Sequence, residues 1–226
     1  HPGARVLALS WDGDTPSKLA GLLVARGMGQ SRLTVLEAMG GPRERARQAT
    51  AAGFDLADVA ALNTIALEVV ATPNAAVVAL SPGLDDGLFE SDGQLTKREV
   101  RAATIAALGP CWGELLWDVG LGAGSIAIEW LLRHPSLKAI GIEDRPERAA
   151  RAARNAASLG APNLQIVQKK APQGFADLPA PDAVFIGGGL SDPGVFDAAW
   201  SQLKPGGRLV ANAVSLQSEA RVIELF

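Results

Sequence analysis

The sequence has 226 residues, of which 48% are hydrophobic and 20% charged, so it encodes globular structure rather than a disordered chain. Its formal net charge of −3 argues against a nucleic-acid-binding surface, which normally carries an excess of basic residues. One cysteine and two histidines exclude an internal disulfide and leave too few ligands for a cysteine- or histidine-based site, so no metal is expected.

The most apolar stretch, residues 61–80, is interrupted by polar residues and a proline and does not resemble a membrane span. The first three residues lead directly into an apolar strand-like run, without the pattern of a secretory signal. A reducing, cytoplasmic location is therefore predicted.

Residues 1–80 show a β-α-β-α-β pattern. Strands are predicted over three apolar ranges: Arg5–Trp11, Arg32–Met39 and Ile65–Ala71. A helix begins at Thr15, where the hydroxyl can cap it and Pro16 suits its first turn, and ends at Gly27 or Gly29. A short charged helix is predicted over Arg43–Ala52. These elements make a thin layer, which indicates part of a larger α/β domain.

The turn-rich acidic stretch 81–93 is predicted to be a linker. Beyond it, helices and strands alternate. Helices are predicted over 96–108, 124–133, 146–158, 172–178, 194–203 and from 216, and strands over 115–119, 137–143, 164–168, 182–186 and 207–214. This alternation predicts right-handed βαβ crossovers and a doubly wound, mostly parallel sheet.

A glycine-rich loop follows the first strand of this second region. Gly120, Gly122 and Gly124 lie between an apolar strand ending at Asp118 and a predicted helix. Glycine is needed where the backbone has a positive φ or must approach a ligand closely. The spacing differs from the G-x-G-x-x-G of dinucleotide-binding folds, which disfavours a nicotinamide dehydrogenase. A tight turn without a ligand is the alternative interpretation.

Glu143 ends the next predicted strand, 19 residues after Gly124. In a doubly wound sheet, an acidic residue there lies beside the glycine loop and can accept hydrogen bonds from both ribose hydroxyls of a nucleoside cofactor. The adjacent Asp144, with Glu147 three residues later, has the pattern of a helix capping box. We therefore assign Glu143 to the ribose and Asp144 to the helix cap.

A Lys-Pro-Gly-Gly turn at residues 204–207 supplies a third motif. Together with the glycine loop and Glu143, it resembles class I S-adenosylmethionine-dependent methyltransferases. The resemblance implies a Rossmann-like fold with S-adenosyl-L-methionine as the cofactor. It also implies a cofactor site formed by Thr96, Gly120, Leu121, Gly122, Ala123, Gly124, Glu143 and Ala171. In that arrangement the glycine loop faces the methionine part and the segment 169–172 lines the adenine.

A closer resemblance covers most of the chain. Residues 92–101 (DGQLTKREVR), the glycine loop, Ala171-Pro172, residues 185–189 (FIGGG) and residues 210–214 (VANAV) occur in the order found in the decarboxylating C15-methyltransferases of cobalamin biosynthesis. The final strands of that sheet have no counterpart before Phe226. Residues 1–80, with segments 34–45 and 63–67, resemble the tail of a tetrapyrrole C5-methyltransferase, a partial C-terminal subdomain.

A chain that joins both regions is similar to the bifunctional precorrin-6Y C5,15-methyltransferases (decarboxylating). The implied domains are 1–80, a linker over 81–93 and a methyltransferase domain over 94–226. The implied substrate is a precorrin, a polyanionic tetrapyrrole. The resemblance also implies a homo-oligomer, with a tetramer as one candidate size.

Thr96, at the start of a predicted helix, has two interpretations. The resemblance places Thr96 over the cofactor, whereas its spacing to Glu99 also fits a capping box. Basic residues on this helix are expected to meet substrate carboxylates, and a solvated helix face is the alternative. The expected substrate contacts are Lys97, Arg98, Arg101, Gly188 and Asn212. The arginines at 145, 148, 151 and 154 are interpreted as a solvated helix face.

The implied reaction is methylation of C15 coupled to decarboxylation of a ring acetate. Methyl transfer from a sulfonium requires alignment and exclusion of water but no obligatory base, and the reduced ring itself can accept the electron pair left by CO2. No residue is assigned to the decarboxylation. Two alternatives stay open: a methyltransferase of the same fold that acts on another small molecule or RNA, and a non-catalytic cofactor-binding module.

Overall fold

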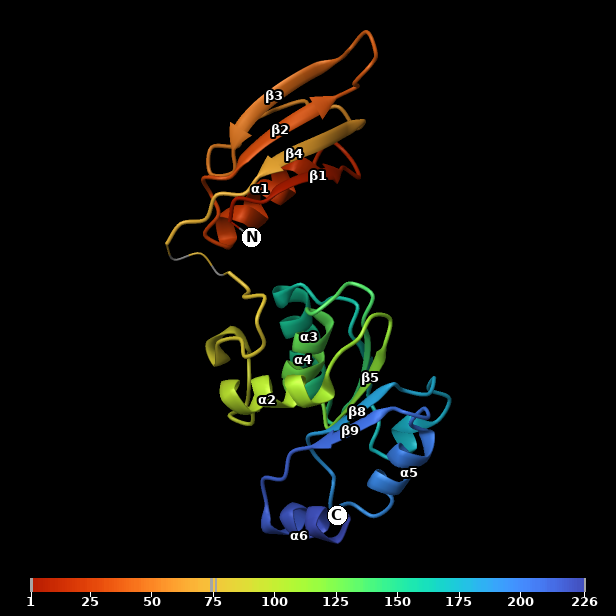
Figure 1. Cartoon of the computed structure of the whole chain (residues 1–226). Coiled ribbons are helices and arrows are strands. Elements are labelled where there is room, and N and C mark those ends of the chain that lie inside the picture. Colours follow the sequence, from red (N-terminus) through yellow and green to blue (C-terminus); the bar gives the residue numbers. More distant parts are fainter. Residues whose placement is uncertain (1, 74, 76, 226) are drawn as a thin grey trace. The chain divides into compact units, whose positions relative to one another are not determined.

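The computed structural model describes residues 2–73, 75 and 77–225. The chain divides into two compact units, His1–Val78 and Ala79–Phe226, which we call the first unit and the second unit (Figure 1). Each unit has its own cluster of buried apolar side chains.

The first unit is an antiparallel sheet with one helix packed on it. Its strands are β1 (Arg5–Leu9), β2 (Arg32–Glu37), β3 (Arg45–Thr50) and β4 (Asn63–Glu68), in the order β1-β4-β2-β3. Helix α1 (Thr15–Ala25) covers one face, where Ala20 and Leu23 pack with Leu33, Ile65 and Leu67. Alternate residues of β2 and β4 are buried, as expected of strands with a single covered face.

The predicted helix over Arg43–Ala52 is wrong, because this stretch contains β3. Arg45 and Arg47 project from the same side of the strand and both bind the buried carboxylate of Glu37, each at 2.8 Å. Although burial alone would raise the pKa of Glu37, the hydrogen bonds from the two guanidinium groups lower it to about 2. Pairing with β2 thus overrides the helical preference of an Arg- and Ala-rich segment.

The second unit has the predicted alternation of helices and parallel strands. Its strands are β5 (Leu115–Val119), β6 (Lys138–Ile142), β7 (Gln165–Val167), β8 (Ala183–Ile186) and β9 (Arg208–Ala211). Its helices are α2 (Arg98–Leu108), α3 (Ser125–Leu131), α4 (Pro146–Leu159), α5 (Val195–Gln202) and α6 (Leu216–Leu225), with the short 3₁₀ turns η1 (Asp86–Leu88) and η2 (Gln173–Phe175). The α/β fold class predicted from the sequence is confirmed.

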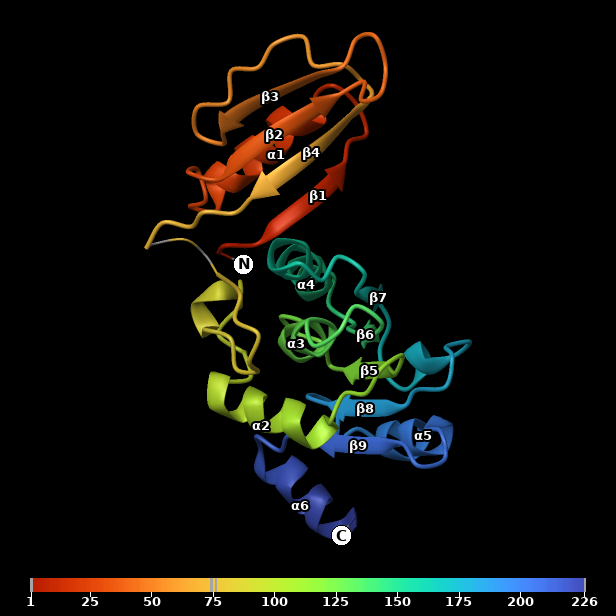
Figure 2. The ribbon, with the colours of Figure 1, turned by 45° about the horizontal axis from the view of Figure 1, so that its top comes forward.

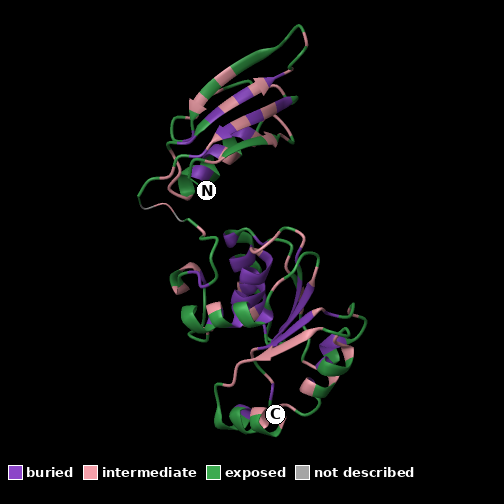
Figure 3. Ribbon diagram, in the orientation of Figure 1, coloured by how far each residue is buried: buried purple, intermediate pink, exposed green. Residues whose placement is uncertain are grey.

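All neighbouring strands of this sheet are parallel, in the order β7-β6-β5-β8-β9. Helices α2, α3 and α4 cover one face and α5 the other (Figures 1 and 2). Trp117 points toward the α5 side and Leu116 toward the opposite side, and both are 0% exposed, so the central strand is buried on both faces (Figure 3). The chain runs from β5 outward to β7 and then returns to β8. The carboxyl ends of β5 and β8 therefore form the switch point where ligands bind in open α/β sheets.

The stretch 81–93 is not a free linker, which corrects the sequence-based expectation. Leu84 and Phe89 are buried, and the backbone N–H groups of Gly83 and Leu84 donate to the buried carboxylate of Glu129 on α3. Two apolar side chains within an acidic, turn-rich stretch were the signal for this docking. Within the described residues, no helix has the length and apolar character needed to cross a membrane.

Candidate functional site

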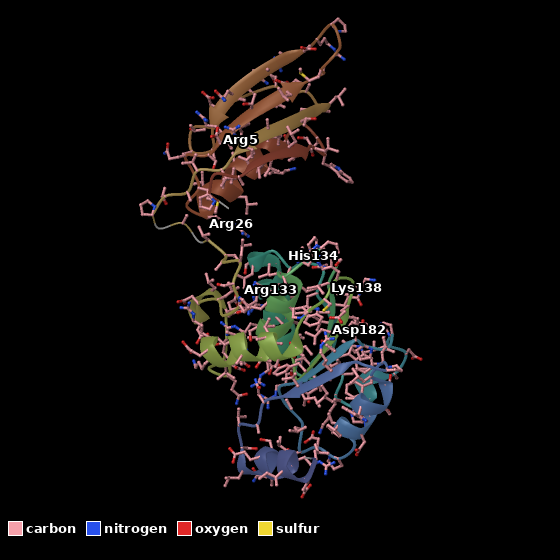
Figure 4. All side chains as sticks on the ribbon, viewed as in Figure 1. Arg5, Arg26, Arg133, His134, Lys138 and Asp182 are labelled. Atoms are coloured by element: carbon pink, nitrogen blue, oxygen red, sulfur yellow. The ribbon has the colours of Figure 1, made fainter. Side chains whose placement is uncertain are left out.

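A cavity of about 680 Å³ lies at the carboxyl ends of the central strands of the second unit. Lys138 is the first residue of β6 and Asp182 directly precedes β8, so both residues, labelled in Figure 4, mark the amino ends of the strands, away from the cavity. Seven of the eight residues expected to bind the cofactor line the cavity: Thr96, Gly120, Leu121, Gly122, Ala123, Glu143 and Ala171. The eighth, Gly124, precedes α3 at its cap position.

The glycine loop has the positive φ angles that its three glycines predict. Gly120, Gly122 and Gly124 have φ values of 75°, 56° and 79°, in the left-handed region. A Cβ on Gly120 would lie 2.8 Å from the backbone nitrogen of Gly188, whereas a Cβ on Gly122 would meet nothing closer than 3.9 Å. Gly120 is therefore required for packing inside the protein, and Gly122 leaves open space beside the cavity.

Glu143 is 5% exposed and lies directly after β6. One carboxylate oxygen accepts a hydrogen bond from the N–H of Gly122 at 2.8 Å, and the other from the N–H of Arg145 at 3.1 Å. An ionised carboxylate offers about four lone-pair positions, so acceptor capacity remains on both oxygens.

The expected capping box at Asp144 does not form, because the cap position of α4 is occupied by Arg145 and no side chain caps it. Asp144 is exposed at the cavity. Glu143, one residue earlier, satisfies the N–H of Arg145 instead, so the strand-end carboxylate serves both the glycine loop and the helix start.

Asp118, at the carboxyl end of β5, also lines the cavity and was not among the residues expected there. It is 1% exposed, and one oxygen accepts a hydrogen bond from the N–H of Ala127 at 3.0 Å. The pKa of Asp118 is raised to about 7, mainly by burial, with a smaller contribution from the charge of Glu143 and an opposing effect of that hydrogen bond. Like Glu143, Asp118 is an acidic residue at the carboxyl end of a predicted strand, so its position was predictable from the sequence.

We expect Asp118 to make the second unit less stable as pH rises from about 4 to about 7. Over this range the folded protein keeps a proton that the unfolded chain has already released, so the unfolded state binds fewer protons and the unfolding free energy falls, by up to about 4 kcal/mol. Chemical denaturation at pH 5 and pH 8 measures the effect.

The matched variants for this measurement are Asp118→Asn, which removes the titrating group, and Asp144→Asn, which changes an exposed carboxyl of the same cavity. The difference in stability between the wild type and Asp118→Asn should depend on pH, and that between the wild type and Asp144→Asn much less. An equal pH dependence in all three proteins would contradict the assignment.

The amino-terminal end of α2 differs from the expected capping box. The helix begins at Arg98 and has Lys97 at its cap position, without a side-chain cap. Thr96 lines the cavity, and its carbonyl accepts a hydrogen bond from Arg101 at 2.5 Å. The Thr96 hydroxyl is therefore free of the capping role.

Arg101 does not lie at the rim, which corrects its assignment as a substrate contact. It is 0% exposed and binds the equally buried Glu129 at 2.5 Å, Asp86 at 3.1 Å and the carbonyl of Leu84. Its guanidinium also lies 4.7 Å from the centre of the Phe89 ring. Arg101 of α2 therefore binds the segment that precedes the helix, and its side chain does not face solvent.

The other expected substrate residues divide into two groups. Lys97, Gly188 and Asn212 line the cavity, and the Asn212 amide donates to the Thr104 hydroxyl at 3.1 Å. Arg98 is exposed and is not part of the cavity lining.

Among the residues that the structure describes, no group of three or more His, Cys, Asp or Glu side chains could hold a metal ion.

The parallel sheet, the switch-point cavity and the glycine loop define the second unit as a class I methyltransferase fold. A solved S-adenosylmethionine-dependent O-methyltransferase from Thermotoga maritima shares the fold, with a TM-score of 0.57 over 89% of this chain and 78% of that chain, at 18% identity. Residues 87–226 match the family model for the precorrin methyltransferase domain. The chain belongs to the precorrin methyltransferase family.

Named relatives agree with this family. A precorrin-6Y C(5,15)-methyltransferase (decarboxylating) from Sinorhizobium sp is 57% identical over 99% of this chain and 54% of its own length, and one from Mycobacterium tuberculosis is 39% identical over 99% and 56%. The crystal structure of the C-terminal domain of precorrin-6Y C5,15-methyltransferase from Rhodobacter capsulatus has a TM-score of 0.61 at 46% identity, over 66% of this chain and 79% of that chain. The chain spans about half the length of the curated relatives it matches.

Proposed function

We propose that the second unit binds S-adenosyl-L-methionine and methylates C15 of a precorrin ring, with decarboxylation of a ring acetate side chain. The names of the full-length relatives support the reaction. The observation that carries the proposal is the juxtaposition of Glu143 and the open glycine loop in one cavity at the switch point.

The residues of the cavity fit this cofactor. Glu143 keeps acceptor capacity on both oxygens, as a ribose diol requires. Gly122 presents backbone without a Cβ, so a ligand can approach closely. The carboxyl of Asp118 lies in the same cavity, where its ionised form would complement an ammonium group.

When bound, the cofactor supplies a methyl group on a positively charged sulfur. Glu143 would hold the ribose, and Gly188 and Asn212 line the same cavity. Buried walls at Val119 and Ile142 exclude water on the cofactor side. The chain thus acts by positioning and desolvation, and the tetrapyrrole ring accepts the electron pair that stays behind when the bond to CO2 breaks.

Substrate carboxylates would meet the cationic groups that border the cavity. Lys97 lies 3.8 Å from Asp86, and Lys170 lies 3.3 Å from Asp192; these lysines are 68% and 66% exposed. Exposed pairs of this kind contribute little to stability, so a substrate carboxylate can replace Asp86 or Asp192 as the partner of the lysine at small cost. Incubation with a precorrin and mass analysis, which detects a methyl gained and CO2 lost, tests the reaction directly.

We predict that Glu143→Gln weakens binding of S-adenosylhomocysteine by about 1–3 kcal/mol, roughly 5- to 150-fold. The variant loses charge-assisted hydrogen bonds and turns an amide N–H toward a backbone N–H donor. Calorimetry measures the affinity and should give one cofactor for each wild-type chain. The control is Glu147→Gln, an exposed carboxylate on α4. Unchanged affinity in Glu143→Gln would refute the ribose assignment.

The remaining parts of the proposal rest on the family. The first unit is assigned to the C-terminal subdomain of a tetrapyrrole C5-methylase, because the named relatives align with it as well as with the second unit. A homo-oligomer, a cytoplasmic location and the absence of nucleic-acid partners stay predictions from the sequence. Sedimentation analysis of the purified chain tests the first of these.

A further inference from the structure

Asn155, on α4, is a buried amide whose hydrogen bonds join two separate stretches of backbone. Its nitrogen donates to the carbonyl of Glu90 and to the carbonyl of Ala123, and its oxygen accepts from the N–H of Glu90, each at 2.9 Å. The side chain is 1% exposed and uses both N–H groups and its carbonyl. The amide therefore fixes the two backbones relative to each other.

Both stretches lead into the lining of the cofactor cavity. Ala123 belongs to the glycine loop, and residues 93–97, which begin three positions after Glu90, line the cavity from the segment before α2. In both ribbon views, the segment before α2 lies beside the layer formed by helices α2, α3 and α4 (Figures 1 and 2). A shift at Glu90 would move this segment relative to the glycine loop.

Arginines of α4 support the same segment from outside. Arg148 binds Asp92 at 2.8 Å and the amide oxygen of Gln94 at 2.7 Å, and Arg151 lies 3.3 Å from Asp92. The face of α4 interpreted as solvated thus docks this segment. These ion pairs are partly exposed and individually weak, whereas the Asn155 amide is buried and also reaches the glycine loop.

We propose that Asn155 is a positioning residue that fixes the shape of the cofactor cavity by tying residues 90–97 to the glycine loop. The inference rests on the proposed function, since it concerns the same cavity. Asn155 itself does not line the cavity and acts through Ala123 and Glu90.

The test is the affinity for S-adenosylhomocysteine of Asn155→Asp, measured by calorimetry well below the unfolding temperature. The variant keeps the shape of the side chain but turns a carboxylate oxygen toward two carbonyls, so we expect affinity to fall at least tenfold. Lowering the pH should narrow the gap to the wild type measured at the same pH, because a protonated carboxyl can donate to one of the carbonyls. A purely structural amide would change the unfolding temperature and leave the affinity intact.

The matched control is Asn63→Asp in the first unit. Asn63 is also buried and donates to backbone carbonyls, those of Asp12 at 3.1 Å, Ala60 at 2.8 Å and Ala61 at 3.5 Å, and its replacement should leave cofactor affinity unchanged. If Asn155→Asp does not fold, Asn155→Ser, which keeps one donor, takes its place. Hydrogen exchange of the wild type gives a further measurement: S-adenosylhomocysteine should slow exchange at the Glu90 amide.

Wild-type affinity in a folded Asn155 variant, or an unchanged exchange rate at Glu90, would overturn the inference. A wild-type chain that binds S-adenosylhomocysteine, with weakened binding in Glu143→Gln, keeps the proposed function whatever the Asn155 variants show. A wild-type chain that does not bind S-adenosylhomocysteine would overturn both.

Discussion

Arg101→Met should destabilise the second unit by about 3–5 kcal/mol, the usual cost of removing one partner from a buried ion pair. The substitution leaves Glu129 buried without its cation and leaves the carbonyls of Leu84 and Thr96 without their side-chain donor. The unfolding midpoint of the second unit, followed by the fluorescence of the buried Trp117 and Trp130, measures the change.

Arg98→Met is the control for this prediction. Arg98 is exposed three residues earlier on the same helix, so its replacement should change stability by no more than about 0.5 kcal/mol. If Arg101→Met kept normal stability and lost only substrate affinity, the rim position expected from the sequence would be right and the buried pair would be wrong.

Gly120→Ala should abolish cofactor binding at the concentrations that saturate the wild type. The added Cβ would lie 2.8–2.9 Å from the backbone nitrogen and Cα of Gly188, at a φ of 75° that alanine rarely adopts. Either the glycine loop or the segment around Gly188 must move, and both line the cavity. Each 1.4 kcal/mol by which strain is greater in the bound than in the free protein weakens affinity about tenfold.

Gly113→Ala separates the effect of space from that of backbone strain. Gly113 has a φ of 81°, but a Cβ there would meet no atom within 4 Å. This control should reduce stability by about 1–2 kcal/mol, as expected for a left-handed alanine, and leave cofactor affinity unchanged. Equal affinities of the two variants would show that contact with Gly188 does not shape the site.

The sequence predicted the second unit better than the first for a physical reason. Strands buried on both faces give continuous apolar runs, and the helices between them carry clear start and stop signals. β3 lacks such a run, because it carries Arg45 and Arg47, which both pair with the buried carboxylate of Glu37 on β2. Two arginines spaced two residues apart, opposite a glutamate in an apolar strand, were the available signal.

The candidate site was predictable where it follows from strand ends. Glu143 and the glycine loop are placed by the parallel sheet itself, so their positions could be inferred before the structure. The role of Arg101 could not, because its burial depends on a segment with little regular structure that folds over α3. Asp118 was predictable in position, but its raised pKa requires knowledge of how deeply it is enclosed.

The hydrogen bond between Glu143 and Gly122 has a consequence for the thermodynamics of binding. The loop is already held by this bond and by the N–H groups of Gly120 and Leu121, which both donate to the carbonyl of Ile142. The conformational entropy of this loop is therefore lost when the protein folds and not when a ligand arrives. Because less entropy is lost on binding, a larger part of the interaction energy contributes to affinity. A loop held in this way also predicts that the site changes little in shape when the ligand binds.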